Sequence, residues 1–268
     1  MKGESSMQTK AIHITRWGDS GPKVVMVHGS AQGSRLGGET HFAAQQRLAS
    51  RGWQVVVPDR PGHGKSPDPG RPDDADLDGA LVADLLGDGA HLVGHSFGGC
   101  VALAAAAQRP GSVRSLTIIE PAMAALAIKK PVVRRFVFGL VKALFLSFSP
   151  ETRIQRFIKL VNIPPELRGG SDAEELRRMG IAIRKLKLPS KGALAEQLET
   201  VRKAGIPLLV ISGGWSPAFD AVCDTVAELG GGSRLDIASP HHFPQLISDE
   251  FNQKLASFMQ EADARRRA

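Results

Sequence analysis

Short apolar runs that alternate with helical segments are the feature that most limits the folds open to this chain. The runs are rich in β-branched residues, and amphipathic or Ala-rich segments separate them. This alternation is typical of a parallel sheet covered by helices on both faces. Strands are predicted at 23–27, 53–57, 91–93, 115–119, 207–212 and 234–238, with a hairpin over 11–17 at the sheet edge, and helices at about 40–50, 80–86, 97–108, 218–228 and 244–261.

One long segment of the chain departs from this alternation of strands and helices. From Pro121 to about Lys203 the chain has no strand candidate, and helical segments separated by prolines follow one another. We therefore predict a helical cap inserted at 121–203 into a core made of 1–120 and 204–268. The apolar run 132–148 is interrupted by basic residues and is too short for a membrane span. We interpret it as a cap helix facing the pocket and core rather than a membrane-surface helix, and expect no stable membrane insertion.

The formal charge of +7 bears on partners rather than on the fold. It would suit nucleic acid or an anionic surface, but the basic residues lack the interleaved aromatic residues on which proteins stack bases, so no nucleic acid is expected. The two cysteines, Cys100 and Cys223, are too far apart for a disulfide framework, and the polar segment 1–10 lacks the apolar centre of a secretion signal. These features predict a cytoplasmic protein, and they leave its oligomeric state open.

A G-x-S-x-G sequence stands where one predicted strand meets the next helix. Gly94-His95-Ser96-Phe97-Gly98 lies between an apolar run and an Ala-rich helix. Such a turn forces its serine into a strained backbone conformation, and the small glycines on either side let the strand and helix approach. Ser96 then projects from a helix N-terminus, where backbone N–H groups can receive negative charge. We predict that Ser96 is a nucleophile and not part of an ordinary tight turn.

With this motif the chain resembles the α/β-hydrolase family, in its serine-nucleophile branch with a helical cap, over nearly its whole length. His28-Gly29-Ser30 is similar to the family's HG loop, and the segment 59–66 is similar to its structural D-x-x-G-x-G-x-S turn. The resemblance implies an α/β fold with a mostly parallel, doubly wound sheet. It also implies an oxyanion hole formed by the backbone N–H of Phe97 and that of Ser30 or Ala31.

Two adjacent histidines follow the last predicted strand. Relatives usually carry G-H-x-P-Q at this loop, which places His242 on the family's catalytic histidine and His241 where a glycine is common. General-base work requires reach to the serine proton, and only one loop position normally allows it. We therefore expect His242 to be the base.

The acid departs from the commoner family pattern. Most relatives carry an aspartate after the strand that here ends at Ser212, but Ser216 stands about where that carboxylate belongs. A minority of the family places the acid at the end of the preceding strand, and there this chain has Glu120. A carboxylate at that position could fix the His242 tautomer and stabilise its charged form. We choose Glu120, with Asp220 as the alternative acid.

Other residues are open to more than one interpretation. Cys100 lies within the helix after the nucleophile and is expected to be a core residue, and the histidines show no spacing for a zinc site. Several aromatic and apolar residues are candidates for pocket walls, although ordinary core packing explains them equally well: Trp215, Phe136, Phe138, Leu140, Phe145 and Phe148.

Together these residues predict a serine hydrolase that forms and then hydrolyses an acyl-enzyme. Carboxylic esters, thioesters and lactones are the candidate substrates, the sequence does not identify the natural one, and no cofactor or metal is expected. The cap predicts a small, mostly apolar substrate, and its basic residues suggest an anionic group on it, although a run of charge is usually a solvated face. Two alternatives remain: hydrolysis of a carbon–carbon bond in a dienoic ring-fission product, and a non-catalytic ligand-binding relative.

Overall fold

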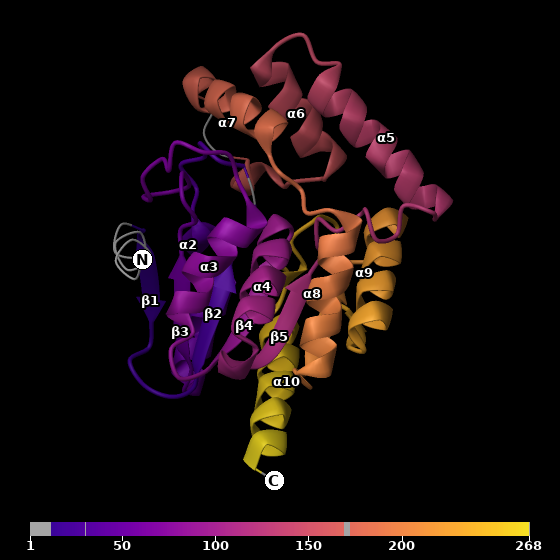
Figure 1. The fold of residues 1–268 in the computed structure, drawn as a ribbon. Helices are drawn as coiled ribbons and strands as arrows, with labels where there is room; N and C mark the ends of the chain where they lie inside the picture. The colour runs from indigo at the N-terminus through magenta and orange to yellow at the C-terminus, as the bar shows by residue number, and fades with distance from the viewer. Residues whose placement is uncertain (1–11, 30, 169–171, 268) are drawn as a thin grey trace, which may run out of the picture.

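A seven-stranded sheet forms the centre of the protein in the computed structural model, which describes residues 12–29, 31–168 and 172–267 (Figure 1). The strands lie in the order β1-β3-β2-β4-β5-β6-β7. Only β1 runs antiparallel to its neighbour, β3, and every other pair is parallel. The strands are β1 Ile14–Trp17, β2 Lys23–Val27, β3 Gln54–Pro58, β4 Ala90–His95, β5 Val113–Ile119, β6 Leu208–Ser212 and β7 Ser233–Asp236.

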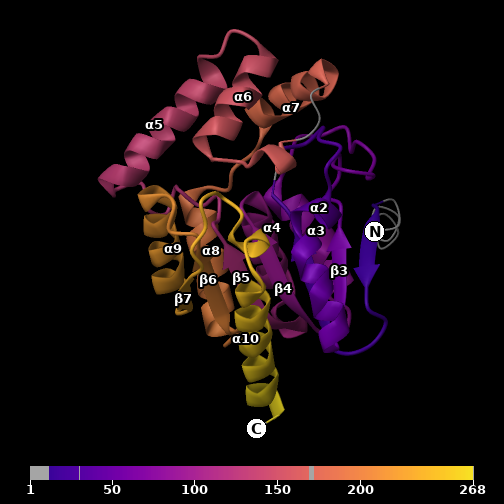
Figure 2. The same ribbon diagram turned by 180° about the vertical axis from the view of Figure 1, so that it is seen from behind.

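The alternation of side chains along each strand builds two separate hydrophobic layers. On β2, Val25 and Val27 belong to the layer under helices α3, α4, α8 and α9, whereas Val24 and Met26 face the 3-10 helix η1 and helix α10. The sheet is therefore covered on both faces, and Figure 2 shows α10 lying across the face opposite to α4. The covering elements are η1 Ala43–Arg51, α3 Ala75–Leu85, α4 Phe97–Gln108, α8 Lys191–Lys203, α9 Pro217–Gly230 and α10 Asp249–Arg267.

Three further helices lie above the ends of the strands (Figure 1). They are α5 Pro131–Phe145, α6 Pro150–Leu160 and α7 Ala173–Lys185, and they pack on one another around Leu144, Ile154 and Ile183. Ser149 caps α6 and Asp172 caps α7, because each side chain accepts a backbone N–H of the first helical turn. The short elements α2 Gly38–His41, η2 Pro110–Ser112, η3 Pro165–Leu167 and η4 Pro244–Leu246 complete the chain.

The predicted mostly parallel α/β fold is confirmed, and its details differ locally. The hairpin expected over 11–17 is wrong in its described part, where Ile14–Trp17 is a single strand paired with β3, which lies far along the chain. Helix α8 falls within the predicted insertion 121–203, yet Leu194, Leu198 and Val201 pack into the core layer beside α4.

Candidate active site

Ser96 occupies a strained turn between β4 and α4. Its φ is +57° and its ψ is −123°, a combination that few non-glycine residues adopt. Gly94 and Gly98 make this turn sterically possible: a Cβ on Gly98 would lie 2.2 Å from the Val27 carbonyl oxygen, and one on Gly94 would lie 2.3 Å from the Gly98 oxygen. The strand and helix therefore approach as the motif predicts, and Ser96 stands at the N-terminus of α4.

Glu120 and His242 lie together beside this turn. The His242 Nδ1 and the Glu120 Oε2 are 2.6 Å apart, and both side chains are buried. Two other groups donate to the same carboxylate, namely Trp215 Nε1 to Oε2 at 2.7 Å and the Gly213 N–H to Oε1 at 2.7 Å. A carboxylate can only accept, so this contact places a His242 proton on Nδ1 and leaves Nε2 as the ring nitrogen that can act as an acceptor.

Backbone strain is concentrated around these residues. In the described part of the chain, the non-glycine residues with positive φ are Ser96, Glu120 at +41° and Asn162 at +51°. Asn162 also holds the loop 239–243, which carries His242 and is called the histidine loop below. Its Nδ2 donates to the Pro240 carbonyl at 2.8 Å, and its own carbonyl accepts the His242 N–H at 3.4 Å. Strain of this kind persists only where surrounding contacts fix it, and it is often found at functional sites.

His95 contacts the histidine loop through a hydrogen bond. Its Nε2 lies 2.7 Å from the His242 carbonyl oxygen, and burial, together with the nearby His242, holds the pKa of His95 well below 6.5. The neutral ring therefore donates through Nε2. Neither His95 nor Asn162 was singled out from the sequence, although the position of His95 next to the serine, and the tolerance of asparagine for positive φ, were available signals.

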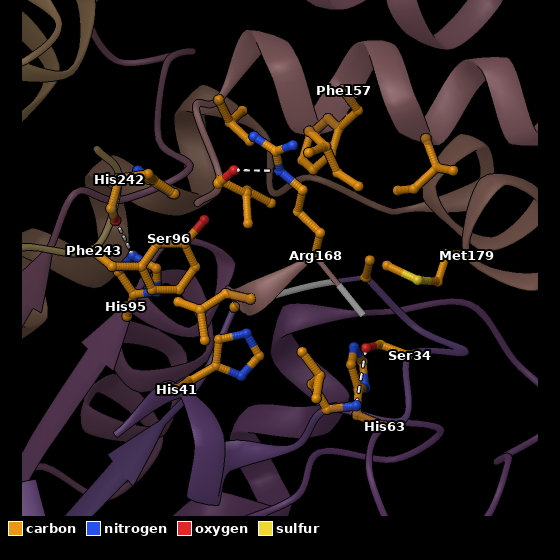
Figure 3. A pocket seen from close by; sticks show the side chains of 18 residues that line it. Ser34, His41, His63, His95, Ser96, Phe157, Arg168, Met179, His242 and Phe243 are labelled. Atoms are coloured by element: carbon orange, nitrogen blue, oxygen red, sulfur yellow. Dashed lines mark hydrogen bonds between the residues drawn. The ribbon is translucent and has the colours of Figure 1, made fainter. Parts of the chain in front are cut away.

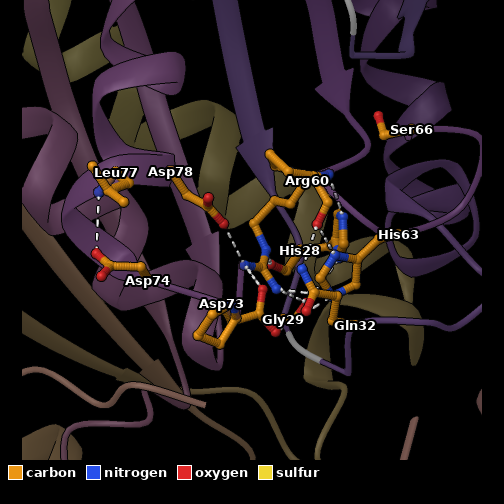
Figure 4. Close-up of polar contacts among 12 residues, drawn as sticks. His28, Gly29, Gln32, Arg60, His63, Ser66, Asp73, Asp74, Leu77 and Asp78 are labelled. Carbon is orange, nitrogen blue, oxygen red and sulfur yellow. Dashed lines mark hydrogen bonds and ion pairs between the residues drawn. The ribbon is translucent and has the colours of Figure 1, made fainter. Parts of the chain in front are cut away.

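The HG loop is fixed by a buried arginine (Figure 4). Arg60 is 1% exposed, and its guanidinium donates to the His28 and Gly29 carbonyls while pairing with Asp73 at 2.7 Å and Asp78 at 2.8 Å. It also lies over the Phe97 ring, 5.0 Å from the ring centroid. One buried cation thus joins the two segments from which the oxyanion hole is expected.

The candidate donors are placed only in part. Phe97 is the first residue of α4, where backbone N–H groups lack intrahelical acceptors. Ala31 is buried and lines the same space as Ser96, whereas Ser30 lies outside the described residues. Gly29 passes so close to the serine that a Cβ there would lie 3.0 Å from the Ser96 Cβ. The two backbone segments therefore flank the serine.

The other candidates stand apart from this constellation. Asp220 accepts a hydrogen bond from the Ser212 hydroxyl and lies 4.0 Å from Arg234. The His241 ring nitrogen accepts the Phe243 N–H at 3.2 Å. Burial raises the pKa of the Cys100 thiol to about 12, as expected for a core residue. Asp59 accepts backbone N–H groups of Gly38 and Lys65, in keeping with a structural turn.

Ser96 is reached by two spaces of very different size. A narrow space of about 30 Å³, room for about one water molecule, is lined by Ser96, His242, His41 and Arg168 (Figure 3). A larger cavity of about 270 Å³ extends from Ser96 under the α5–α7 layer. Apart from Ser96 and Arg184, the residues that line this cavity are all apolar.

The candidate pocket walls divide into three groups. Phe136, Leu140 and Phe145 line the larger cavity. Phe138 and Phe148 instead face solvent, with exposed fractions of 61% and 100%. Trp215 binds Glu120, as described above. Among the described residues, no group of three or more histidine, cysteine, aspartate or glutamate side chains is arranged to hold a metal ion.

Comparison with known proteins gives consistent matches. The sequence pattern of the alpha/beta hydrolase family matches residues 24–254. Lipase LipV of Mycobacterium tuberculosis is 38% identical over 120 residues, which are 42% of each chain. The pimeloyl-[acyl-carrier protein] methyl ester esterase of Chromobacterium violaceum is 39% identical over 103 residues, 37% of each chain. Less than half of either relative's length is therefore matched.

Solved structures extend the likeness to nearly the whole fold. The N-acyl homoserine lactonase AidH, in its complex with N-butanoyl homoserine, superposes with a TM-score of 0.66 at 23% sequence identity. The superposition covers 94% of this chain and 93% of the lactonase. At this level of identity the likeness shows the shared fold alone.

Proposed function

Because this chain belongs to the alpha/beta hydrolase family, we propose that it is a serine hydrolase that cleaves a carboxylic ester, thioester or lactone through an acyl-enzyme on Ser96. The observation that carries the proposal is the buried Glu120–His242 contact beside the strained serine turn. Relatives named as a lipase and an esterase support the same reaction class.

The proposed reaction uses only groups of this chain. His242 accepts the Ser96 proton at Nε2 as the serine oxygen attacks the substrate carbonyl, and Glu120 stabilises the imidazolium that forms. The N–H of Phe97 and an N–H of the HG loop, from Ser30 or Ala31, stabilise the negative charge on the carbonyl oxygen. His242 then protonates the leaving group, and a water activated by the same ring releases the acid and restores Ser96.

The two spaces beside Ser96 favour a mostly apolar acyl group. The larger cavity can take an apolar chain, since burial of each CH₂ group contributes about 0.8 kcal/mol. The narrow space near His41 and Arg168 has room for the attacking water. We propose that the insertion 121–203 acts as the cap through α5, α6 and α7, while α8 packs on the core.

Hydrolysis of a p-nitrophenyl ester series from acetate to long acyl chains tests this function. The native protein is expected to hydrolyse longer acyl esters better than acetate. Ser96→Ala should abolish turnover, and Ser50→Ala, an exposed serine on η1, should leave it unchanged. If no ester is cleaved, the protein is mixed with a dienoic ring-fission substrate. Consumption of this substrate would indicate carbon–carbon hydrolysis, and binding without turnover would indicate a ligand-binding protein.

A further inference from the structure

The outer side of α5 presents large apolar side chains to solvent. Phe138, Val141 and Phe145 follow one another at helical spacing, with exposed fractions of 61%, 45% and 55%. Leu146 and Phe148, which follow the end of α5, are exposed at 63% and 100%. A helix on a protein surface normally turns polar residues outward, and a contiguous apolar patch of this kind usually marks an interaction site. We call these five residues the α5 patch.

The α5 patch lies in a strongly basic part of the chain. The segment 121–160 contains eight basic residues and one acidic residue, so its net charge equals the +7 of the whole chain. The Lys142 ammonium lies over the Phe138 ring at 4.3 Å from its centroid. Within the described residues, the basic side chains of α5 form no ion pair with a carboxylate, and Arg134 and Arg135 are exposed at its N-terminal end. This surface therefore combines aromatic residues with unpaired cations.

The exposure of Phe138 and Phe148 departs from the sequence interpretation of 132–148 as a helix that faces only the pocket and core. We propose that the α5 patch docks on the surface of an anionic phospholipid bilayer. Phenylalanine and leucine side chains would enter the boundary between headgroups and acyl chains, and the neighbouring lysine and arginine residues would pair with lipid phosphates. A second copy of this chain is a poorer occupant, because a symmetric dimer through α5 would bring two strongly positive segments together. A bilayer satisfies both the apolar residues and the charge.

This docking surface is continuous with the cavity that reaches Ser96. Val141 and Phe145 belong to the α5 patch and also line the cavity, so they form a shared wall. In Figure 1, α5 lies at the outer margin of the layer formed by α5, α6 and α7, with its lower end beside α9. Docking would therefore bring lipid next to the cavity wall without any helix crossing the bilayer; none of the described helices is long and apolar enough to do so.

Vesicle co-sedimentation of the full chain tests the proposal. The Ser96→Ala protein is used, so that binding is measured without hydrolysis and independently of the proposed enzyme function. We expect it to bind phosphatidylcholine vesicles that contain phosphatidylglycerol, and to bind pure phosphatidylcholine at least tenfold more weakly. Added salt should weaken the binding.

Three variants in this background locate the surface. Phe138→Ser with Phe148→Ser, neither of which lines the cavity, should weaken binding at least tenfold. Arg134→Gln with Arg135→Gln should reduce binding and its dependence on salt. The matched control Leu77→Ser removes an exposed apolar residue from α3, 50% exposed, and should bind normally. Failure to bind anionic vesicles, or equal binding by the phenylalanine variant and the control, would overturn the proposal, as would a dimer abolished by the phenylalanine variant in the absence of vesicle binding.

Discussion

Replacing Glu120 by glutamine removes one charge and leaves three donors in place. The Glu120 carboxylate accepts from His242 Nδ1, Trp215 Nε1 and the Gly213 N–H at 2.6 to 2.7 Å. A glutamine has a single side-chain oxygen, so in either orientation its NH₂ group faces at least one of these N–H donors. If the NH₂ group faces His242, Nδ1 must become the acceptor and the ring proton moves to Nε2. In this tautomer Nε2 cannot accept the Ser96 proton, so His242 can no longer act as the base.

The expected loss is large because the carboxylate acts on the transition state. Loss of a histidine's orienting carboxylate in comparable triads costs about 10⁴-fold in kcat. We expect Glu120→Gln to lower kcat by about 10³- to 10⁴-fold, which corresponds to about 4 to 5.5 kcal/mol of transition-state stabilisation. KM should change much less, since the carboxylate contacts His242 and not the cavity.

Steady-state hydrolysis of the preferred p-nitrophenyl ester measures this loss. Asp220→Asn serves as the matched control, because Asp220 bonds Ser212 and lies near Arg234 rather than at His242. It should retain activity within tenfold. Circular dichroism and urea unfolding establish that both variants are folded. A Glu120→Gln protein that is folded and nearly fully active would refute the reasoning, and a large loss in Asp220→Asn alone would move the acid to Asp220.

Three other predictions concern the core, the pH dependence and the cavity. Arg60→Met leaves the buried Asp73 and Asp78 without their shared cation, and urea unfolding should show a loss of about 3 to 5 kcal/mol in the free energy of unfolding; an unchanged midpoint would contradict this. Burial and the adjacent Arg60 lower the pKa of His63 from 6.5 to about 4, so the folded protein holds this ring neutral. The stability that His63 contributes is present above pH 6.5 and is lost as the pH falls toward 4, by up to about 3 kcal/mol. The urea midpoint of His63→Gln should therefore fall less steeply over this pH range than that of the native protein. Parallel curves for the two proteins would exclude His63 as the cause. Leu140→Trp adds bulk to the larger cavity and should shift ester preference toward shorter acyl chains at unchanged acetate turnover, whereas an unaltered preference would place the acyl group elsewhere.

Much of the fold could be predicted because it depends on local patterns. The β4–Ser96–α4 turn combines a buried strand, two glycines and an Ala-rich helix within one short stretch, so neighbouring residues alone specify it. Parallel strands read as continuous apolar runs because both faces of the sheet are covered. The hairpin predicted for the edge strand β1 is wrong because β1 pairs with β3, which lies far along the chain. The local sequence of β1 does not indicate such a distant partner.

The placement of Glu120 beside the serine turn could be predicted, because it depends on the end of one strand. Glu120 follows β5 directly, and the parallel register of β5 with β4 and β6 brings that end beside the serine turn and Gly213. The burial of Arg60 could not be inferred, since its partners Asp73 and Asp78 stand 13 and 18 residues further along the chain. The role of Asn162 was hidden for a similar reason, because it joins the end of α6 to a loop in the distant C-terminal part.

Covalent labelling of the serine tests the central claim most directly. The native protein would be treated with a fluorophosphonate, which reacts with an activated serine hydroxyl, and the modified peptide identified by mass spectrometry. The account predicts a single adduct on Ser96, absent in Ser96→Ala and formed orders of magnitude more slowly in Glu120→Gln. An active protein labelled at another residue, or one whose Ser96→Ala variant still hydrolyses esters at the native rate, would contradict it.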